Sequence, residues 1–169
     1  FPGVKITLIG AGDLVQDSED RQIKDFLEKL SRIKADVKIL ICGNHDAVRL
    51  SEPQPVLDKK IAPLLYKNEN VIFTTNPSIV NILSDENFSG FNILMYHGFS
   101  FPYYSEEVDG VRRNGRLDGV DLIMKFLLQR RHMAPTHGCN TYVPTANEDH
   151  LIIDIVPDFF VSGHIHKTN

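Results

Sequence analysis

The order of apolar runs at the start of the chain constrains the fold more than any other feature. A β-branched run at residues 5–10 precedes a helical repeat of apolar residues that ends near Ile33, and a second apolar run follows at residues 37–42. Strand, helix and strand in this order form a parallel crossover unit. The sequence therefore predicts an α/β fold in which Asp13 and Asn44 follow neighbouring strands at one sheet edge, where ligands bind in open α/β sheets.

The rest of the chain predicts further strands and helices from the same periodicities. Irregular structure is expected at residues 100–116 and 135–149. The first helix, at residues 18–33, is expected to begin with Asp17 or Ser18 as its N-cap. Strands are predicted at residues 71–74, 78–83, 91–96, 151–156 and 159–162, and helices at residues 57–66 and 117–131.

Composition narrows the class of protein. With 169 residues, 42% of them hydrophobic, the chain suits a single domain over residues 1–169. Eighteen basic and 22 acidic residues give a net charge of -4, which argues against binding nucleic acid through bulk charge. Cys42 and Cys139 form no closely spaced pair, and no apolar run is long enough to span a membrane. We therefore expect no disulfide framework, no membrane association and a cytoplasmic location.

Four predicted strands end on residues that can bind metal. The first leads to Asp13, the second to Asn44-His45-Asp46, the strand at 91–96 to His97, and the last to His164 and His166. Each motif by itself fits an ordinary turn. Together, carboxylate, amide oxygen and imidazole at one sheet edge predict a centre for divalent ions such as Mn, Fe, Zn or Ni.

Two ions held in this way have a defined chemistry. A pair about 3.5–4 Å apart can clamp a phosphate and supply hydroxide for attack on phosphorus. Asp13 is predicted to bridge the ions, and His164 and His166 are predicted to serve one ion each. His45, with Asp46 to orient its imidazole, is predicted to stabilise developing charge or protonate the leaving oxygen. Three further histidines are expected to be structural or solvent-facing: His132, His137 and His150.

The order of these motifs resembles the calcineurin-like metallophosphoesterase superfamily. Three longer stretches resemble the small subunits of archaeal family-D DNA polymerases: GNHDAVRLSEPQP at 43–55, RRHMAPTHG at 130–138 and EDHLIIDIVPDFFVSGHIH at 148–166. The resemblance implies two facing mixed β-sheets flanked by helices. It also implies a proofreading 3′–5′ exonuclease, related to Mre11-type nucleases, that acts on the 3′ end of DNA and pairs with a large catalytic subunit.

The resemblance also assigns roles to residues. It implies Asp13 as bridging ligand, His166 on one ion and His45 as the catalytic histidine, with two divalent ions, Mn²⁺ being the expected metal. The other ion would be held by Asn44, His97 and His164. The superfamily's first motif, Asp-x-His, does not precede Asp13. We therefore expect a chain that lacks the first strand and the C-terminal end of the fold, with weak or single-ion occupancy.

Two other functions fit the same residues. One is a phosphatase or nucleotide phosphodiesterase of the same fold, and the other is a scaffold subunit of the polymerase without hydrolytic activity. Arg112, Arg113 and Arg116 are the candidate contacts to the DNA backbone, although such clusters are usually solvated. The aromatic stretch at residues 99–104 is either a platform for unpaired bases or a loop packed on its own core.

Overall fold

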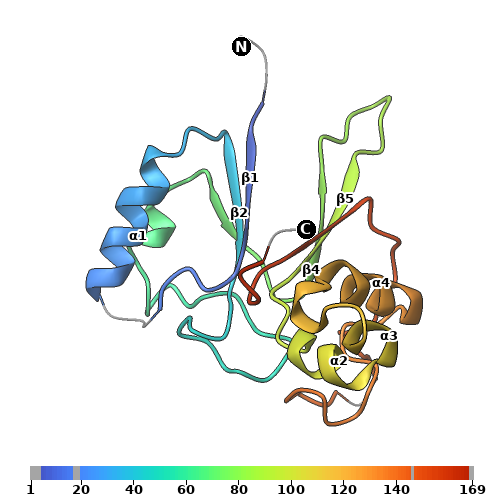
Figure 1. Ribbon diagram of the computed structural model, residues 1–169. Helices are drawn as coiled ribbons and strands as arrows, with labels where there is room; N and C mark the ends of the chain where they lie inside the picture. The colour runs from blue at the N-terminus through green and yellow to red at the C-terminus, as the bar shows by residue number, and fades with distance from the viewer. Residues whose placement is uncertain (1–4, 17–19, 146, 168–169) are drawn as a thin grey trace.

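The strands in the described part of the chain form two three-stranded sheets, and Figure 1 shows their arrangement. The computed structural model describes residues 5–16, 20–145 and 147–167. One sheet has the order β1-β2-β3 with all strands parallel; in the other, β4-β5-β6, the first pair is antiparallel and the second parallel. The strands are β1 (Thr7–Ala11), β2 (Val37–Ile41), β3 (Val71–Phe73), β4 (Ser78–Ile82), β5 (Phe91–Tyr96) and β6 (Phe159–Ser162).

The two sheets face each other across an apolar layer. Ile39 and Ile41 of β2 pack with Ile93 and Met95 of β5, and all four are buried. Because side chains alternate along a strand, the intervening residue Leu94 packs on the opposite side of its sheet. The predicted α/β fold of two facing sheets flanked by helices is confirmed, with one sheet purely parallel.

Helices cover the outer faces of both sheets (Figure 1). Ile23 of the first helix joins a buried cluster with Cys42 and Leu65, while Ile123 and Leu127 join the cluster that contains Tyr96. The elements are α1 (Asp20–Arg32) on the first sheet, α2 (Phe101–Glu107), α3 (Asp109–Arg112) and α4 (Val120–Arg130) on the second, and the 3-10 turns η1 (Leu65–Lys67) and η2 (Arg116–Asp118). No helix in the described ranges is both long and apolar enough to cross a membrane.

Three predicted elements were wrong. Residues 100–116 are largely helical, because Phe101, Tyr104 and Ser105 bury one side of the short helix α2 against the core. Residues 57–66 hold only the beginning of a 3-10 turn. Residues 151–154 alternate between buried and exposed side chains as a strand would, but in the described residues their pairing is limited to one isolated bridge, from His132 to Ile152. The predicted N-cap residues Asp17 and Ser18 lie outside the described residues.

Candidate metal centre

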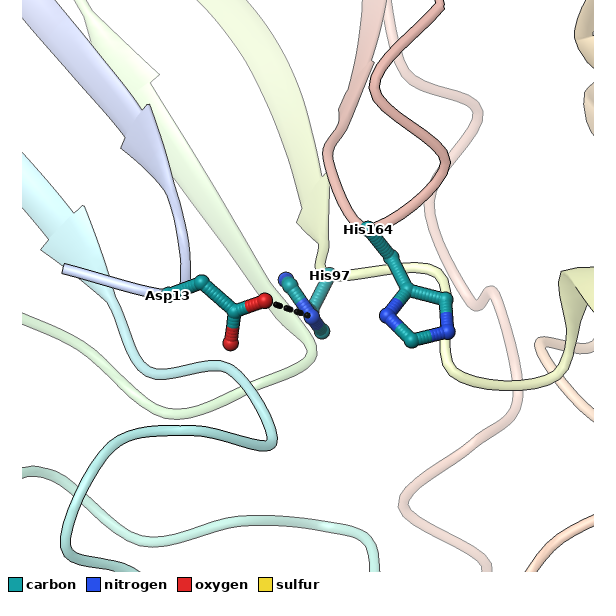
Figure 2. Close-up of side chains that lie close together, drawn as sticks. All are labelled: Asp13, His97 and His164. Atoms are coloured by element: carbon teal, nitrogen blue, oxygen red, sulfur yellow. Dashed lines mark ion pairs between the residues drawn. The ribbon is translucent and has the colours of Figure 1, made fainter. Parts of the chain in front are cut away.

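The ends of four strands bring the predicted ligands together. Strands β1 and β2 are parallel, so Asp13, which follows β1, lies beside the loop that follows β2. Strands β5 and β6 are also parallel, so His97, which follows β5, lies beside His164, which follows β6. Figure 2 shows the Asp13 carboxylate directed at the His97 ring, with the His164 ring close by. The expected meeting of these residues at one edge is what the structure describes.

The polar atoms at this edge lie within reach of one ion. His97 Nε2 lies 3.0 Å from Asn44 Oδ1 and 3.4 Å from Asp13 Oδ2. One ligand atom from each of Asp13, His97 and His164 lies within 4.8 Å of the others. Carboxylate, amide oxygen and imidazole are the donor set that first-row divalent ions accept.

The protonation of His97 explains why a cation belongs here. Its Nδ1 lies 2.8 Å from the carbonyl oxygen of Ala11, which can only accept a hydrogen bond, so Nδ1 carries a proton. In the neutral ring, Nε2 then carries a lone pair, which faces two oxygen acceptors, Asn44 Oδ1 and Asp13 Oδ2. The repulsion between these electron-rich atoms is relieved by a metal ion, by a proton on Nε2, or by an Asn44 amide turned to donate its N–H to Nε2. The residues present therefore fit a divalent metal.

Asp46 fixes the two loops that carry the oxygen ligands. Its buried carboxylate accepts backbone hydrogen bonds from Gly43 at 2.8 Å and from Leu14 and Val15 at 3.2 Å each. Burial raises the pKa of this carboxyl, and the three N–H donors oppose the shift. The partners described for Asp46 are thus backbone groups of the ligand loops, through which it positions Asp13 and Asn44.

Two glycines allow the loops to approach closely. A Cβ on Gly12 would lie 2.4 Å from Nδ1 of His97, and Gly12 has a φ of +89°. A Cβ on Gly43 would lie 2.2 Å from Oδ1 of Asp13. Neither position has room for a larger residue without displacement of a candidate ligand.

Three candidate ligands have left-handed backbone conformations. The φ angles are 50° at Asp13, 66° at His164 and 56° at His166. A non-glycine residue in this region costs on the order of 1 kcal/mol or more, and such residues cluster at functional sites. The Asp13 conformation is supported by the backbone N–H of His45, which donates to Asp13 Oδ1 at 3.0 Å.

His45, His97 and His166 lie close enough to His164 to affect its pKa. Burial lowers the pKa of His164, and the neighbouring imidazoles of His97, His166 and His45 lower it further, against the opposing effect of Asp13. His45 and His166 are themselves exposed. A half-buried imidazole with a lowered pKa stays neutral and is available as a ligand at neutral pH.

Comparison with known proteins agrees with this geometry. A profile of the calcineurin-like phosphoesterases matches residues 2–168. The chain belongs to the calcineurin-like phosphoesterase family. The fold of this family implies divalent metal ions, consistent with the donor set around Asp13 and His97.

This chain has relatives among archaeal proteins. It is 38% identical to the DNA polymerase II small subunit of Methanothermobacter thermautotrophicus over 94% of its own length and 34% of the relative. Identity is 40% with that of Halobacterium salinarum, over 86% of this chain and 27% of the relative, and 33% with that of Pyrococcus abyssi, over 94% and 26%. The chain spans about a third or less of these relatives. The resemblance to such subunits is confirmed.

A chain of buried amides behind the centre was not anticipated from the sequence. Gln54 donates from Nε2 to the Gly43 carbonyl at 3.2 Å, Asn76 donates to Gln54 Oε1 at 2.6 Å, and the backbone N–H of His97 donates to Asn76 Oδ1 at 2.8 Å. These hydrogen bonds connect the loop after β2 to His97, the candidate ligand that follows β5. Gln54 and Asn76 are each next to a proline in an irregular segment, where no apolar periodicity predicts that a residue is buried.

The three arginines lie on the helical layer of the second sheet, around α3 and η2. Arg112 pairs with Asp109, Arg113 lies 4.0 Å from the same carboxylate, and Arg116 lies 3.3 Å from Glu106. Their side chains are largely exposed. The structure gives them intramolecular acidic partners, and contact with DNA stays a prediction.

Proposed function

We propose that this phosphoesterase is the metal-dependent 3′–5′ exonuclease subunit of a replicative DNA polymerase. The observation that carries the proposal is the convergence of Asp13, Asn44 and His97 on one point with His164 close by. The relatives are small subunits of DNA polymerase II, which supports DNA as the substrate and a large catalytic subunit as the partner. The site of action would be the archaeal cytoplasm.

The centre would hold two divalent ions, with Mn²⁺ the expected metal. Asn44, His97 and His164 would bind one ion, His166 the other, and Asp13 both. Bound ions of this kind supply an activated water and neutralise charge on the phosphate. The second ion has fewer ligands within this chain, so we expect it to bind more weakly.

His45 is the proposed acid. Its side chain is exposed beside the ligands, and its backbone N–H is bonded to Asp13, which fixes the position of the residue against the centre. An imidazole has its pKa near neutral pH, so it can give a proton to the leaving oxygen of a cleaved phosphodiester. Asp46 positions both loops, and the arginines of α3 and η2 would contact the DNA backbone.

A scaffold role is the second candidate. The relatives are described by their place in a polymerase, which a subunit can occupy without hydrolysis. A phosphatase or nucleotide phosphodiesterase is the third, since the family as a whole is one of phosphoesterases.

The deciding experiment is Mn²⁺-dependent degradation of a 3′-mismatched primer by the complete protein. We compare the wild type with Asp13→Ala and His45→Ala, and with Asp25→Ala, an exposed carboxylate on α1, as control. The exonuclease proposal expects activity in the wild type and the control, and its loss in both site variants.

Other outcomes point to the other functions. An inactive wild type that binds Mn²⁺ would support the scaffold role. Hydrolysis of small chromogenic phosphoesters without primer degradation would support a phosphatase or nucleotide phosphodiesterase.

A further inference from the structure

Three phenylalanines form an exposed aromatic patch at one end of the second sheet. Phe88 lies in the hairpin between β4 and β5, Phe91 begins β5 and Phe159 begins β6. The ring centroids of Phe88 and Phe91 lie 5.0 Å apart and those of Phe91 and Phe159 lie 5.6 Å apart, both pairs edge to face. The three residues are 41%, 36% and 54% exposed. Contiguous apolar surface that is open to solvent is typical of interaction sites.

The aromatic patch continues the apolar layer between the two sheets. Phe91 lies on the same face of β5 as Ile93, because side chains alternate along a strand. Ile93 is buried between the sheets and is the register partner of Phe159 in β6. Phe91 and Phe159 therefore lie on the inner face of the second sheet, beyond the part that the first sheet covers. Figure 1 shows the hairpin between β4 and β5 projecting at this end.

Hydrogen bonds hold the backbone of the aromatic patch in place. Asp85 Oδ1 accepts from the backbone N–H groups of Asn87 at 2.7 Å and Phe88 at 2.9 Å, which fixes the hairpin. Asp158 Oδ2 accepts from the backbone N–H of Asn92 at 2.8 Å, which fixes the start of β6 against β5. A surface that is already ordered loses less conformational entropy when a partner binds.

The charge around the aromatic patch narrows the class of partner. Residues 78–92 and 155–162, which carry the patch, include Asp85, Glu86 and Asp158 and contain no lysine or arginine. These carboxylates repel the phosphates of DNA. Two copies of this chain joined through the patch would bring the same carboxylates together, which disfavours a homodimer. The complementary partner is a protein segment whose apolar side chains are flanked by lysine or arginine.

The position of the aromatic patch leaves the candidate metal centre accessible. β5 begins at Phe91, and His97 follows its other end. At about 3.3 Å per residue, the six steps between them span about 20 Å. β6 likewise begins at Phe159 and leads toward His164. A partner docked on the patch therefore lies at the end of the sheet away from the candidate ligands.

We propose that the aromatic patch docks the large catalytic subunit of the polymerase. The docked segment covers the three rings with apolar side chains and pairs its lysine or arginine residues with the acidic rim of Asp85, Glu86 and Asp158. This inference rests on the proposed function, which supplies that partner. It does not depend on hydrolysis, and it holds equally for a scaffold subunit.

The test is the affinity of the complete protein for the purified large subunit, measured by biolayer interferometry. In the double variant Phe91→Thr/Phe159→Thr, threonine keeps the β-propensity of both strands and removes the rings. We expect its affinity to fall at least about thirtyfold. Tyr142→Thr is the matched control, because Tyr142 is 45% exposed and its ring contacts His137. The control should retain wild-type affinity.

Glu86→Lys tests the acidic rim separately. Glu86 is exposed in the hairpin, so its replacement leaves the packing of the sheets unchanged. We expect the affinity to fall roughly fivefold, and the effect to shrink as salt is raised. Glu107→Lys, which makes the same charge change on exposed α2, should retain wild-type affinity. Equal losses in the two variants would overturn the role of the rim.

The outcomes separate this inference from the proposed function. A wild type that does not bind the large subunit would overturn the partner named there. Tight binding by the wild type and the double variant alike would overturn the docking site alone. Retained affinity together with a lower melting temperature of the unbound double variant would show that another segment of the same protein covers the aromatic patch, which also overturns the docking site.

Discussion

Glu52 is a carboxyl held in an environment that favours its neutral form. Burial raises the pKa of Glu52 from its ordinary value of 4.5 to about 7, and the hydrogen bonds from Tyr96 and Asn140 oppose that shift. The folded protein therefore binds a proton at pH 6 that the unfolded chain releases. This difference makes the free energy of unfolding depend on pH.

The first prediction concerns this dependence. The stabilisation from protonated Glu52 is fully present below pH 4.5 and is lost as the pH rises through about 7, a change of about 3 kcal/mol. The free energy of unfolding is measured with urea at pH 4.5 and at pH 8. Between these two pH values, the wild type should lose about 3 kcal/mol more than Glu52→Gln does. Parallel pH profiles of the two proteins would contradict it.

Asp46→Asn tests the second buried carboxylate. The asparagine cannot accept all three backbone N–H groups of Gly43, Leu14 and Val15, so we expect a loss of about 2 kcal/mol or more in the free energy of unfolding. The matched control is Asp36→Asn, an exposed carboxylate that accepts from the Ile6 N–H at 2.6 Å. The control should lose less than about 1 kcal/mol, and equal losses would refute the role of burial.

At the scale of elements, the loops after the strands are organised by close backbone contact. The loop after β1 and the loop after β2 meet at Gly43, whose missing side chain leaves room for the Asp13 carboxylate. Parallel pairing of β1 and β2 fixes the register of both loops, from Thr7 opposite Val37 to Ala11 opposite Ile41. Ligand geometry thus depends on the strands and on one small residue.

Gly43→Ala should therefore damage the site more than the fold. The new Cβ would lie 2.4 Å from the Asp13 backbone nitrogen as well as against its carboxylate, so Asp13 must move. We expect Mn²⁺ affinity, measured by calorimetry, to fall at least about tenfold. Gly110→Ala in α3, where a Cβ meets nothing within 4 Å, should retain wild-type affinity. Unchanged affinity in Gly43→Ala would show that the loop relaxes freely.

At the scale of the whole molecule, the candidate metal centre lies where the two sheets meet. Asp13 and Asn44 follow strands of the first sheet, while His97 and His164 follow strands of the second. An ion held by all four residues would tie the sheets together at one edge. Since the unfolded chain lacks this arrangement, metal binding should add to the stability of the whole fold.

Thermal unfolding measures this effect. With Mn²⁺ at about 100 times its dissociation constant, the melting temperature should rise by about 5–10 °C, and EDTA should reverse the rise. Asp13→Asn should lose the shift, and Asp25→Asn, an exposed carboxylate on α1, should keep it. A shift of the same size in both variants would place the ion elsewhere.

The sequence determined the sheets and the ends of their strands. Apolar periodicity is a local property, so the crossover of β1, α1 and β2 and the strands β5 and β6 were predictable, as was the meeting of Asp13 with Asn44. Short helices with few buried residues, such as α2, carry a weak periodic signal and were missed. The strand predicted at 151–156 does not form, because a strand needs a neighbouring strand with which to exchange backbone hydrogen bonds. Apolar periodicity does not show whether such a neighbour exists.

Only the tertiary structure decided how polar groups are buried. Glu52, Gln54 and Asn76 look like loop residues in the sequence, yet each is buried with a hydrogen-bond partner from a distant part of the chain. The backbone role of Asp46 and the protonation of His97 Nδ1 depend equally on contacts between segments more than 30 residues apart. Such contacts follow from how the sheets and loops pack in three dimensions, and local sequence patterns do not encode them.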